Sequence, residues 1–131
     1  MGKFRKTERL CSRESIGKLF SKGKVLFHYP FRLVWIDSAG DGPYPVRIAI
    51  SVPKKRIKKA VTRNRIRRVI RESYRINKSI LYESPGMRGR KIDIMLLYIS
   101  DKVYDFDFID VKLKELIHKF IQHHAPGKNN I

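Results

Sequence analysis

Arginine and lysine side chains crowd one segment of the chain, residues 54–75, which reads KKRIKKAVTRNRIRRVIRESYR. The segment holds eleven Lys or Arg residues against one acid, Glu72, and so supplies +10 of the formal net charge of +18. Guanidinium groups form paired hydrogen bonds with phosphate oxygens, and cations this dense repel one another in a compact fold. The segment therefore predicts a polyanionic partner.

The spacing within this segment predicts an amphipathic helix beginning at Ala60. At about 100° per residue, one arc of that helix carries apolar and small side chains, and the opposite arc carries an amide and four guanidinium groups. The first arc comprises Ile66, Val69, Ile70, Ser73 and Tyr74, and the second comprises Asn64, Arg67, Arg68, Arg71 and Arg75. We expect the first arc to be buried and the second to face the partner, although a solvated face with no fixed target remains an alternative.

The cations before the helix, and the last arginine within it, are interpreted differently from the central ones. Lys54, Lys55, Arg56, Lys58 and Lys59 precede the helix and are expected to act as looser point charges. Arg75 lies three residues after Glu72, so its guanidinium is expected to pair with that carboxylate across the helix surface.

No group of residues suggests that this chain catalyses a reaction by itself. The sequence has no glycine-rich phosphate loop, no Cys-x-x-Cys pair and no His-x-x-x-His helix motif. Asp105, Asp107 and Asp110 could be ligands of a hard metal, but we favour a capped helix start, and we interpret the tandem histidines at 123–124 as a solvated helix end. We therefore expect no catalytic residue and no metal site in the chain, and place any linked catalysis in a partner.

Composition limits the class of protein. With 131 residues and an apolar share of 42%, the chain predicts one globular domain, with an ordered core over about residues 9–122 and flexible basic ends. Its longest apolar run, residues 94–99, is too short to span a bilayer, and the basic N-terminus lacks the apolar segment of a signal peptide. Cys11 has no partner for an intramolecular disulfide, which fits a cytoplasmic location.

The patterning predicts an α+β fold. In chain order we expect a helix over 12–21 capped by Ser12 and followed by Gly23, strands over 30–36 and 46–52, the basic helix ending near 77–81, a loop over 83–91, a strand over 92–99 and a helix capped by Asp107. We expect the first two strands to form a hairpin through the turn at 38–45, and the almost wholly apolar strand over 92–99 to be central. The last helix should bury a stripe comprising Ile109, Leu113, Leu116, Ile117, Phe120 and Ile121, and residues 125–131 should be disordered.

The residues AVTRNRIRRVIRESYR, preceded by a strand ending SVPKK, resemble the arginine–asparagine–arginine signature of the bacterial ribonuclease P protein subunit. The stretch RLCSRESIGKLFSKGK is similar to the first helix and turn of that family, and FRLVWI is similar to its first strand. The resemblance implies a two-layer α/β sandwich of αβββαβα order, ribosomal-protein-S5-domain-2-like. It also implies a left-handed βαβ crossover, whereas the general rule favours the right hand.

The resemblance also implies a function. In that family the RNA subunit holds the active site, uses magnesium ions and removes the 5′ leader of precursor tRNA, while the protein supports substrate binding. The positions of the RNA-binding signature fall on Arg63, Asn64, Arg67, Arg68 and Arg71. By the same resemblance we expect one protein per ribonuclease P RNA, a monomer when isolated, and magnesium held through the RNA.

A second site is implied for the single-stranded leader. The family's cleft positions fall on Ile16, Phe20 and Val34, of which only Phe20 keeps the family's aromatic character. Alternation along the strand places Arg32 beside Val34 on one face, where its guanidinium could contact a phosphate or stack on a base. The other face carries Phe31, Leu33 and Trp35, and we assign Phe31 and Trp35 to the core.

Other classes of protein fit parts of the pattern. A structural RNA-binding protein, such as a ribosomal protein or an RNA chaperone, has the same charge and size. A DNA-binding regulator would need a helix just upstream of the basic helix, where a strand is expected instead. A membrane-surface helix would need a bulkier apolar face than one containing Ser73. All would bind in a salt-sensitive way, so selective affinity for one RNA is the discriminating observation.

Overall fold

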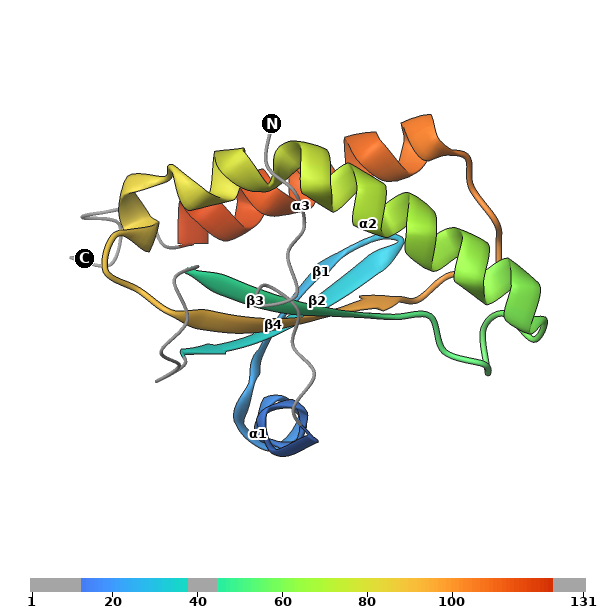
Figure 1. Cartoon of the computed structure of the whole chain (residues 1–131), viewed down its shortest axis with the longest axis horizontal. Helices are drawn as coiled ribbons and strands as arrows, with labels where there is room; N and C mark the ends of the chain where they lie inside the picture. The colour runs from blue at the N-terminus through green and yellow to red at the C-terminus, as the bar shows by residue number, and fades with distance from the viewer. Residues whose placement is uncertain (1–12, 38–44, 124–131) are drawn as a thin grey trace.

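The computed structural model describes residues 13–37 and 45–123 of the chain. The predicted Ser12 cap, Cys11, nearly all of the 38–45 turn, His124 and the tail over 125–131 lie outside these residues. The elements in chain order are α1 (Arg13–Lys22), β1 (Lys24–His28), β2 (Phe31–Asp37), β3 (Val46–Ser51), α2 (Ala60–Tyr82), the short 3-10 helix η2 (Pro85–Met87), β4 (Ile92–Tyr98) and α3 (Phe106–His123) (Figure 1). This order confirms the α+β class and the αβββαβα arrangement.

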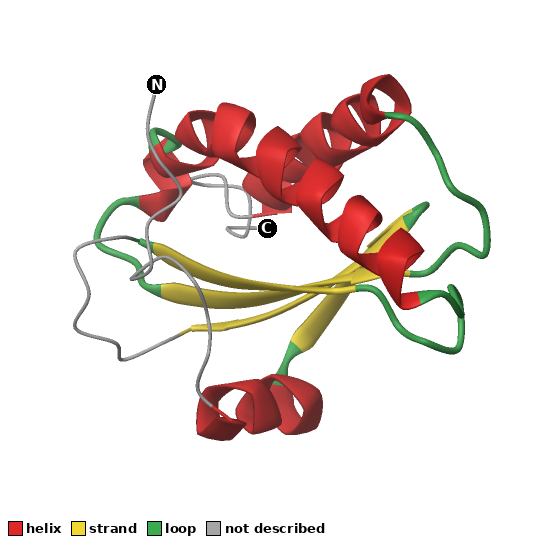
Figure 2. Cartoon of the chain, turned by 45° about the vertical axis from the view of Figure 1, so that its right-hand side comes forward, coloured by secondary structure: helices red, strands yellow, loops and turns green. Residues whose placement is uncertain are grey.

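The four strands form one sheet in the order β1-β2-β4-β3. β1 and β2 pair antiparallel, as do β2 and β4, whereas β3 and β4 are parallel. Helices α2 and α3 lie together over one face of the sheet, and α1 lies on the opposite face (Figure 2). The parallel β3–α2–β4 unit is the crossover for which the resemblance implies a left hand; that hand stays a prediction.

Strand pairing differs from the sequence-based expectation in two ways. β2 and β3 do not form a hairpin, because β4 lies between them and pairs with both. In addition, FRLVWI is the second strand of the fold, since the unpredicted strand β1 precedes it. The first error arises because β4, which is apolar except for Asp93, is covered on both faces and takes a central place, and that displaces β3 to one edge.

The core is divided unequally between the two faces of the sheet. Phe31, Leu33 and Trp35 of β2 join the main core beneath α2 and α3, as predicted. On the other face, a small cluster of Leu19, Val34 and Met95 fixes α1 against the sheet. Gly23 ends α1 by donating its N–H to the Leu19 carbonyl at 2.9 Å, and a Cβ at this position would collide with that carbonyl, so a glycine is required.

Helix α3 begins one residue before the predicted cap. The side chain of Asp105 accepts a hydrogen bond from the Phe108 N–H at 3.0 Å, so Asp105 caps the helix and the prediction of Asp107 was wrong. Asp107 instead lies in the first turn, where its charge favours the helix dipole. The predicted apolar stripe is confirmed, with five residues buried and Ile121 packed at the margin of the core.

Candidate nucleic-acid interface

Helix α2 divides into a buried face and a basic face, as its periodicity predicts. Ile66, Ile70 and Tyr74 are 3%, 0% and 2% exposed and pack into the main core. Asn64 and Arg68 lie on the opposite side, where both are exposed. The basic face, which we define as Asn64, Arg67, Arg68, Arg71 and Arg75, is thus fixed in orientation by the packing beneath it.

The cations before α2 are arranged by a short turn. Residues 53–59, called the basic loop below, connect β3 to α2, and the N–H groups of Arg56 and Ile57 donate to the Pro53 carbonyl at 3.0 and 3.1 Å. The side chain of Ile57 is buried in the core. Because Ile57 anchors the loop, its charged neighbours face solvent, namely Lys54, Lys55, Arg56, Lys58 and Lys59. The sequence signal for this anchor was a lone isoleucine between two runs of cations.

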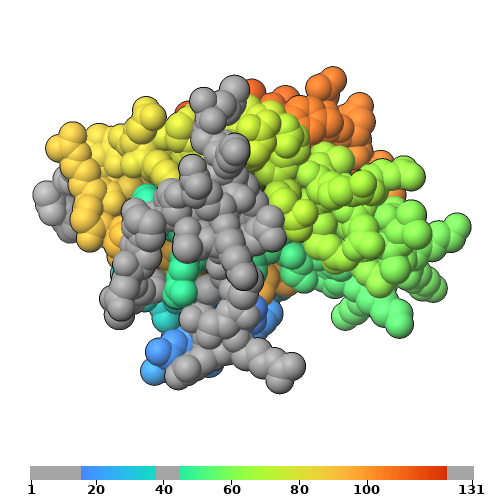
Figure 3. Space-filling view, in the orientation of Figure 1, coloured from blue at the N-terminus to red at the C-terminus, as the bar shows by residue number. Residues whose placement is uncertain are grey.

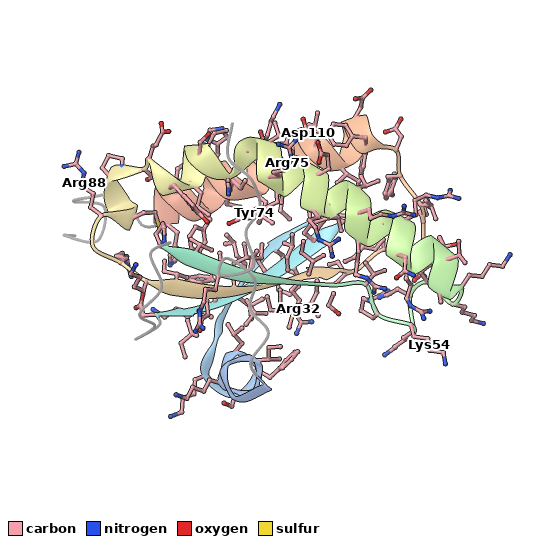
Figure 4. The ribbon with its side chains drawn as sticks, viewed as in Figure 1. Arg32, Lys54, Tyr74, Arg75, Arg88 and Asp110 are labelled. Atoms are coloured by element: carbon pink, nitrogen blue, oxygen red, sulfur yellow. The ribbon has the colours of Figure 1, made fainter. Side chains whose placement is uncertain are left out.

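The basic loop and the basic face meet at one end of the molecule. Figure 3 shows long green side chains projecting from that end, and in Figure 4 Lys54 lies at its lower edge, beneath the start of α2. Arg56 is partly neutralised by Asp101, whose carboxylate lies 3.6 Å away. The surface is therefore strongly cationic and accessible, as the binding of a polyanion requires.

Arg63 holds the basic loop against the helix. Its Nη1 donates to the carbonyl oxygens of Ile57 at 2.9 Å and Lys58 at 2.7 Å. These bonds turn the guanidinium back toward the loop backbone, so Arg63 positions the loop cations. A direct contact of Arg63 with RNA stays a prediction.

Two further signature residues act as a pair on the basic face. The guanidinium of Arg67 donates to the side-chain oxygen of Asn64, which orients the Asn64 amide so that its NH₂ is available to an acceptor. Arg68 makes no hydrogen bond or ion pair with any residue in the described ranges, 13–37 and 45–123. An exposed guanidinium in that state is suited to bidentate phosphate binding.

Arg75 pairs within its own helix, as predicted. Its Nη2 and Nε donate to the two carboxylate oxygens of Glu72 at 2.7 and 3.1 Å. The hydrogen bond from Arg75 lowers the pKa of Glu72 below its ordinary value. The charge of Arg75 is therefore balanced locally by Glu72.

The predicted leader residues differ in accessibility. Phe20 is 64% exposed, so its ring is open to a base. Ile16 is partly buried beside the α1 cluster, and Val34 is only 4% exposed because α1 covers it. Val34 therefore supports Leu19 and is too enclosed to contact a bound strand, which corrects its predicted role. Arg32, two residues earlier, lies on the α1 side of the sheet (Figure 4).

Of the three aspartates that could be metal ligands by sequence, two accept hydrogen bonds from the protein itself. Asp105 caps α3, and Asp110 accepts hydrogen bonds from Ser73 at 2.7 Å and Asn77 at 2.8 Å. Within residues 13–37 and 45–123, no cluster of three His, Cys, Asp or Glu side chains could hold a metal ion. Over the same residues, no helix has the length and apolar character needed to cross a membrane.

Comparison with known proteins identifies the family of this chain. The sequence model of ribonuclease P matches residues 4–120. The ribonuclease P protein component of Porphyromonas gingivalis is 37% identical over 106 residues, which are 80% of this chain and 77% of that relative. That of Chlorobium phaeobacteroides is 30% identical over 125 residues, covering 87% and 85% of the two chains.

Solved structures agree with the sequence comparison. The ribonuclease P protein of Thermotoga maritima superposes with a TM-score of 0.67 at 27% identity, covering 86% of this chain and 96% of the other. The Staphylococcus aureus protein, at 24% identity, has the same fold with a TM-score of 0.67, covering 86% and 94%. The chain, with its amphipathic basic helix and αβββαβα fold, belongs to the ribonuclease P protein family.

Proposed function

We propose that this chain is the protein subunit of a ribonuclease P holoenzyme, the endonuclease that removes the 5′ leader of precursor tRNA. The observation that carries the proposal is the surface on which the family's signature residues and the basic loop meet. Its cations face solvent while the opposite side of the same helix is buried. A fixed array of this kind suits the regularly spaced phosphates of a folded RNA.

The basic face and the basic loop have distinct tasks in this proposal. Arg68 supplies forked donors to backbone phosphates, and the Asn64 amide suits a 2′-hydroxyl or a base edge. Lys54 and Lys55 add point charges that screen repulsion between the ribonuclease P RNA and the precursor tRNA. Arg63 keeps these lysines in place through the loop carbonyls.

The leader strand is proposed to lie on the other side of the sheet, between α1 and the basic loop. The exposed ring of Phe20 offers a stacking surface, and Arg32 offers a cation on the same side. Ile16 forms part of the floor beside them. This arrangement predicts contacts to the leader backbone and ring faces, with little dependence on base identity.

Hydrolysis is assigned to the RNA subunit. Magnesium ions bound there would activate water and stabilise the departing oxygen. The carboxylates of Asp105 and Asp110 do not fit such a role, since each already accepts hydrogen bonds that hold helix α3 in place. We accordingly assign no catalytic residue to this chain and propose that it acts by binding, as a monomer, one copy per RNA, in the cytoplasm.

Cleavage of precursor tRNA tests the proposal. The organism's own ribonuclease P RNA is assayed at low magnesium concentration with and without the purified protein, and the product 5′ end is mapped. Marked stimulation at the correct site is expected, because added cations substitute for part of the magnesium needed for RNA folding and substrate binding. Cleavage by the protein alone would overturn the assignment of catalysis to the RNA.

The same experiment also tests the alternative that the chain is a general structural RNA-binding protein. It predicts no stimulation of cleavage together with tight binding to other structured RNAs. Parallel filter-binding measurements with an unrelated folded RNA of the same length therefore separate a dedicated subunit from a general RNA-binding protein.

A further inference from the structure

We propose that Phe27 of β1 and Arg32 of β2 together form a binding site for one nucleotide of the leader strand. A base would stack on the Phe27 ring, and the adjoining phosphate would be bound by the Arg32 guanidinium. The inference rests on the proposed function, since it names a contact for the leader within that assembly.

The sheet register places the two side chains next to each other. Phe27 lies opposite Arg32, Arg32 lies opposite Leu97, and Leu97 lies opposite Ser51. Residues opposite each other share a face, so the four form one row across the sheet. With about 4.8 Å between strands, the row spans roughly 14 Å. It ends at Ser51, two residues before the basic loop begins.

The row lies on the α1 side of the sheet, at the part that α1 leaves open. Helix α1 packs over β2 and β4 through Leu19, Val34 and Met95, and leaves the edge strand β1 uncovered. Val25 and Phe27 of β1 are accordingly 44% and 56% exposed. In Figure 4, Arg32 lies just beneath the sheet beside α1, on the side toward Lys54. A strand following the row would run from the basic loop to Phe27.

Two arginines on this face of the sheet differ in how their charge is balanced. Arg47 donates from Nε and Nη2 to the two carboxylate oxygens of Asp93, both at 2.9 Å. Arg32 has no carboxylate partner among the residues described, and its buried Nε has no hydrogen-bond acceptor. Arg32 as a whole is only partly buried, so its guanidinium charge, which no carboxylate of the described residues balances, is available to a phosphate.

Phe27 and Arg32 are also in contact. The guanidinium carbon of Arg32 lies 5.7 Å from the centroid of the Phe27 ring. This cation–π contact holds the arginine beside the ring, while more than half of the Phe27 side chain stays open to solvent. A stacking surface with a guanidinium at its edge matches single-stranded RNA, whose bases present ring faces and whose backbone presents phosphates.

The test compares substrates that differ only in the leader. Phe27→Leu keeps an apolar side chain but removes the ring, and Arg32→Met keeps the stem but removes the charge. Holoenzymes reconstituted with each variant are titrated with precursor tRNA and with mature tRNA, which lacks the leader. We expect each variant to weaken precursor binding by at least about fivefold, as for the loss of one stacked base, with mature tRNA binding unchanged.

A second aromatic–cation pair provides the matched control. Lys112 lies 5.6 Å from the centroid of the Phe108 ring on α3, which covers the opposite face of the sheet. Phe108→Leu removes a comparable ring and is expected to leave precursor binding unchanged. Thermal melting of every variant verifies folding, and Arg32→Met still tests the site should Phe27→Leu prove unfolded.

The outcomes separate this inference from the proposed function. If wild-type protein stimulates cleavage but Phe27→Leu and Arg32→Met bind precursor as wild type does, the nucleotide site is wrong and the subunit assignment stands. Equal losses for precursor and mature tRNA would likewise exclude a leader site. If wild-type protein fails to stimulate cleavage, the proposed function itself fails.

Discussion

The two faces of helix α2 contrast in what they contribute. The buried face inserts Ile66, Ile70 and Tyr74 into the main core. The basic face, one half-turn away, places Asn64 and Arg68 in solvent. Because both faces belong to one 23-residue helix, packing on the first fixes the positions of the charges on the second. Stability and RNA binding should therefore be separable by substitutions only a few residues apart.

The polar residues of the two faces differ as well. On the buried side, Ser73 and Asn77 are 0% and 3% exposed, and both donate to the Asp110 carboxylate of α3. On the basic side, the only acid of the helix is Glu72, which pairs with Arg75. Buried polar groups thus have protein partners, whereas the cations of the basic face outnumber the acids available to them.

The largest effect is expected for Ile70→Ala. Ile70 is fully buried, so the truncation should lower the free energy of unfolding by about 2–5 kcal/mol through a core cavity. Chemical denaturation measures this loss. The milder Ile70→Val should cost about 0.5–1.5 kcal/mol, and the folded fraction of each variant should retain wild-type RNA affinity. An unchanged unfolding midpoint for Ile70→Ala would mean that the helix does not pack as described.

The next effect concerns the polar contact between α2 and α3. Asp110→Ala removes the acceptor of the Ser73 hydroxyl and one of the acceptors of the Asn77 amide, and the expected loss is about 1–3 kcal/mol. Asp107→Ala, which removes an exposed acid in the first turn of α3, three residues before Asp110, is the control and should cost less. Similar losses for the two variants would show that the helix dipole, rather than the α2–α3 contact, accounts for the effect.

The same variant has a predicted pH dependence. Burial raises the pKa of Asp110, but hydrogen bonds from Ser73, Lys114 and Asn77 outweigh burial and lower the pKa below its ordinary value. A depressed folded-state pKa stabilises the fold above the unfolded value of about 3.9, and this contribution disappears as the pH falls through the folded pKa. The stability difference between wild type and Asp110→Ala should therefore be constant near neutral pH and shrink in acid.

How far the sequence predicts the fold depends on whether a signal is local. Periodicity placed the faces of α2 and the stripe of α3 correctly, because burial of one helix face repeats every three to four residues. Strand β1 was missed, since KVLFH is short and has polar residues at both ends. The predicted pairing of the second and third strands was wrong because β4 lies between them in the sheet, although the long helix α2 separates it from β3 in the chain. Asp105 and Asp107 are equally suitable caps by residue type, and only the backbone distinguishes them.

Within the candidate site, too, the features set by neighbouring residues could be predicted, and those set by the folded backbone could not. The exposed placement of Asn64 and Arg68 and the Arg75–Glu72 pair could be predicted, since they depend on residues within one helix. The anchoring of the basic loop by Ile57 and the contact of Arg63 with the loop carbonyls required the folded backbone. Phe27 was overlooked together with its strand, and Val34 was assigned to the leader cleft by the family resemblance, which does not say that α1 covers this position.

Arg68→Ala is expected to weaken RNA binding and to leave stability unchanged. Its guanidinium is exposed and has no partner in the described part of the chain, so the melting temperature should not change. Loss of one phosphate contact should weaken affinity for the ribonuclease P RNA and reduce the slope of log affinity against log salt concentration by about one. A large loss of stability would mean that the two faces of α2 had been assigned in reverse.

Arg75→Ala completes this comparison as the matched control, because it removes the same group about two turns further along the same face. Two donors of Arg75 are already engaged by Glu72, so fewer remain for a phosphate. The salt slope should change less than for Arg68→Ala, and the melting temperature should again be unaffected, since an exposed ion pair contributes little. Equal losses of affinity for the two variants would show instead that RNA competes successfully with Glu72. The basic face would then extend as an unbroken array of four arginines, and the acid would serve only to hold Arg75 in position until RNA binds.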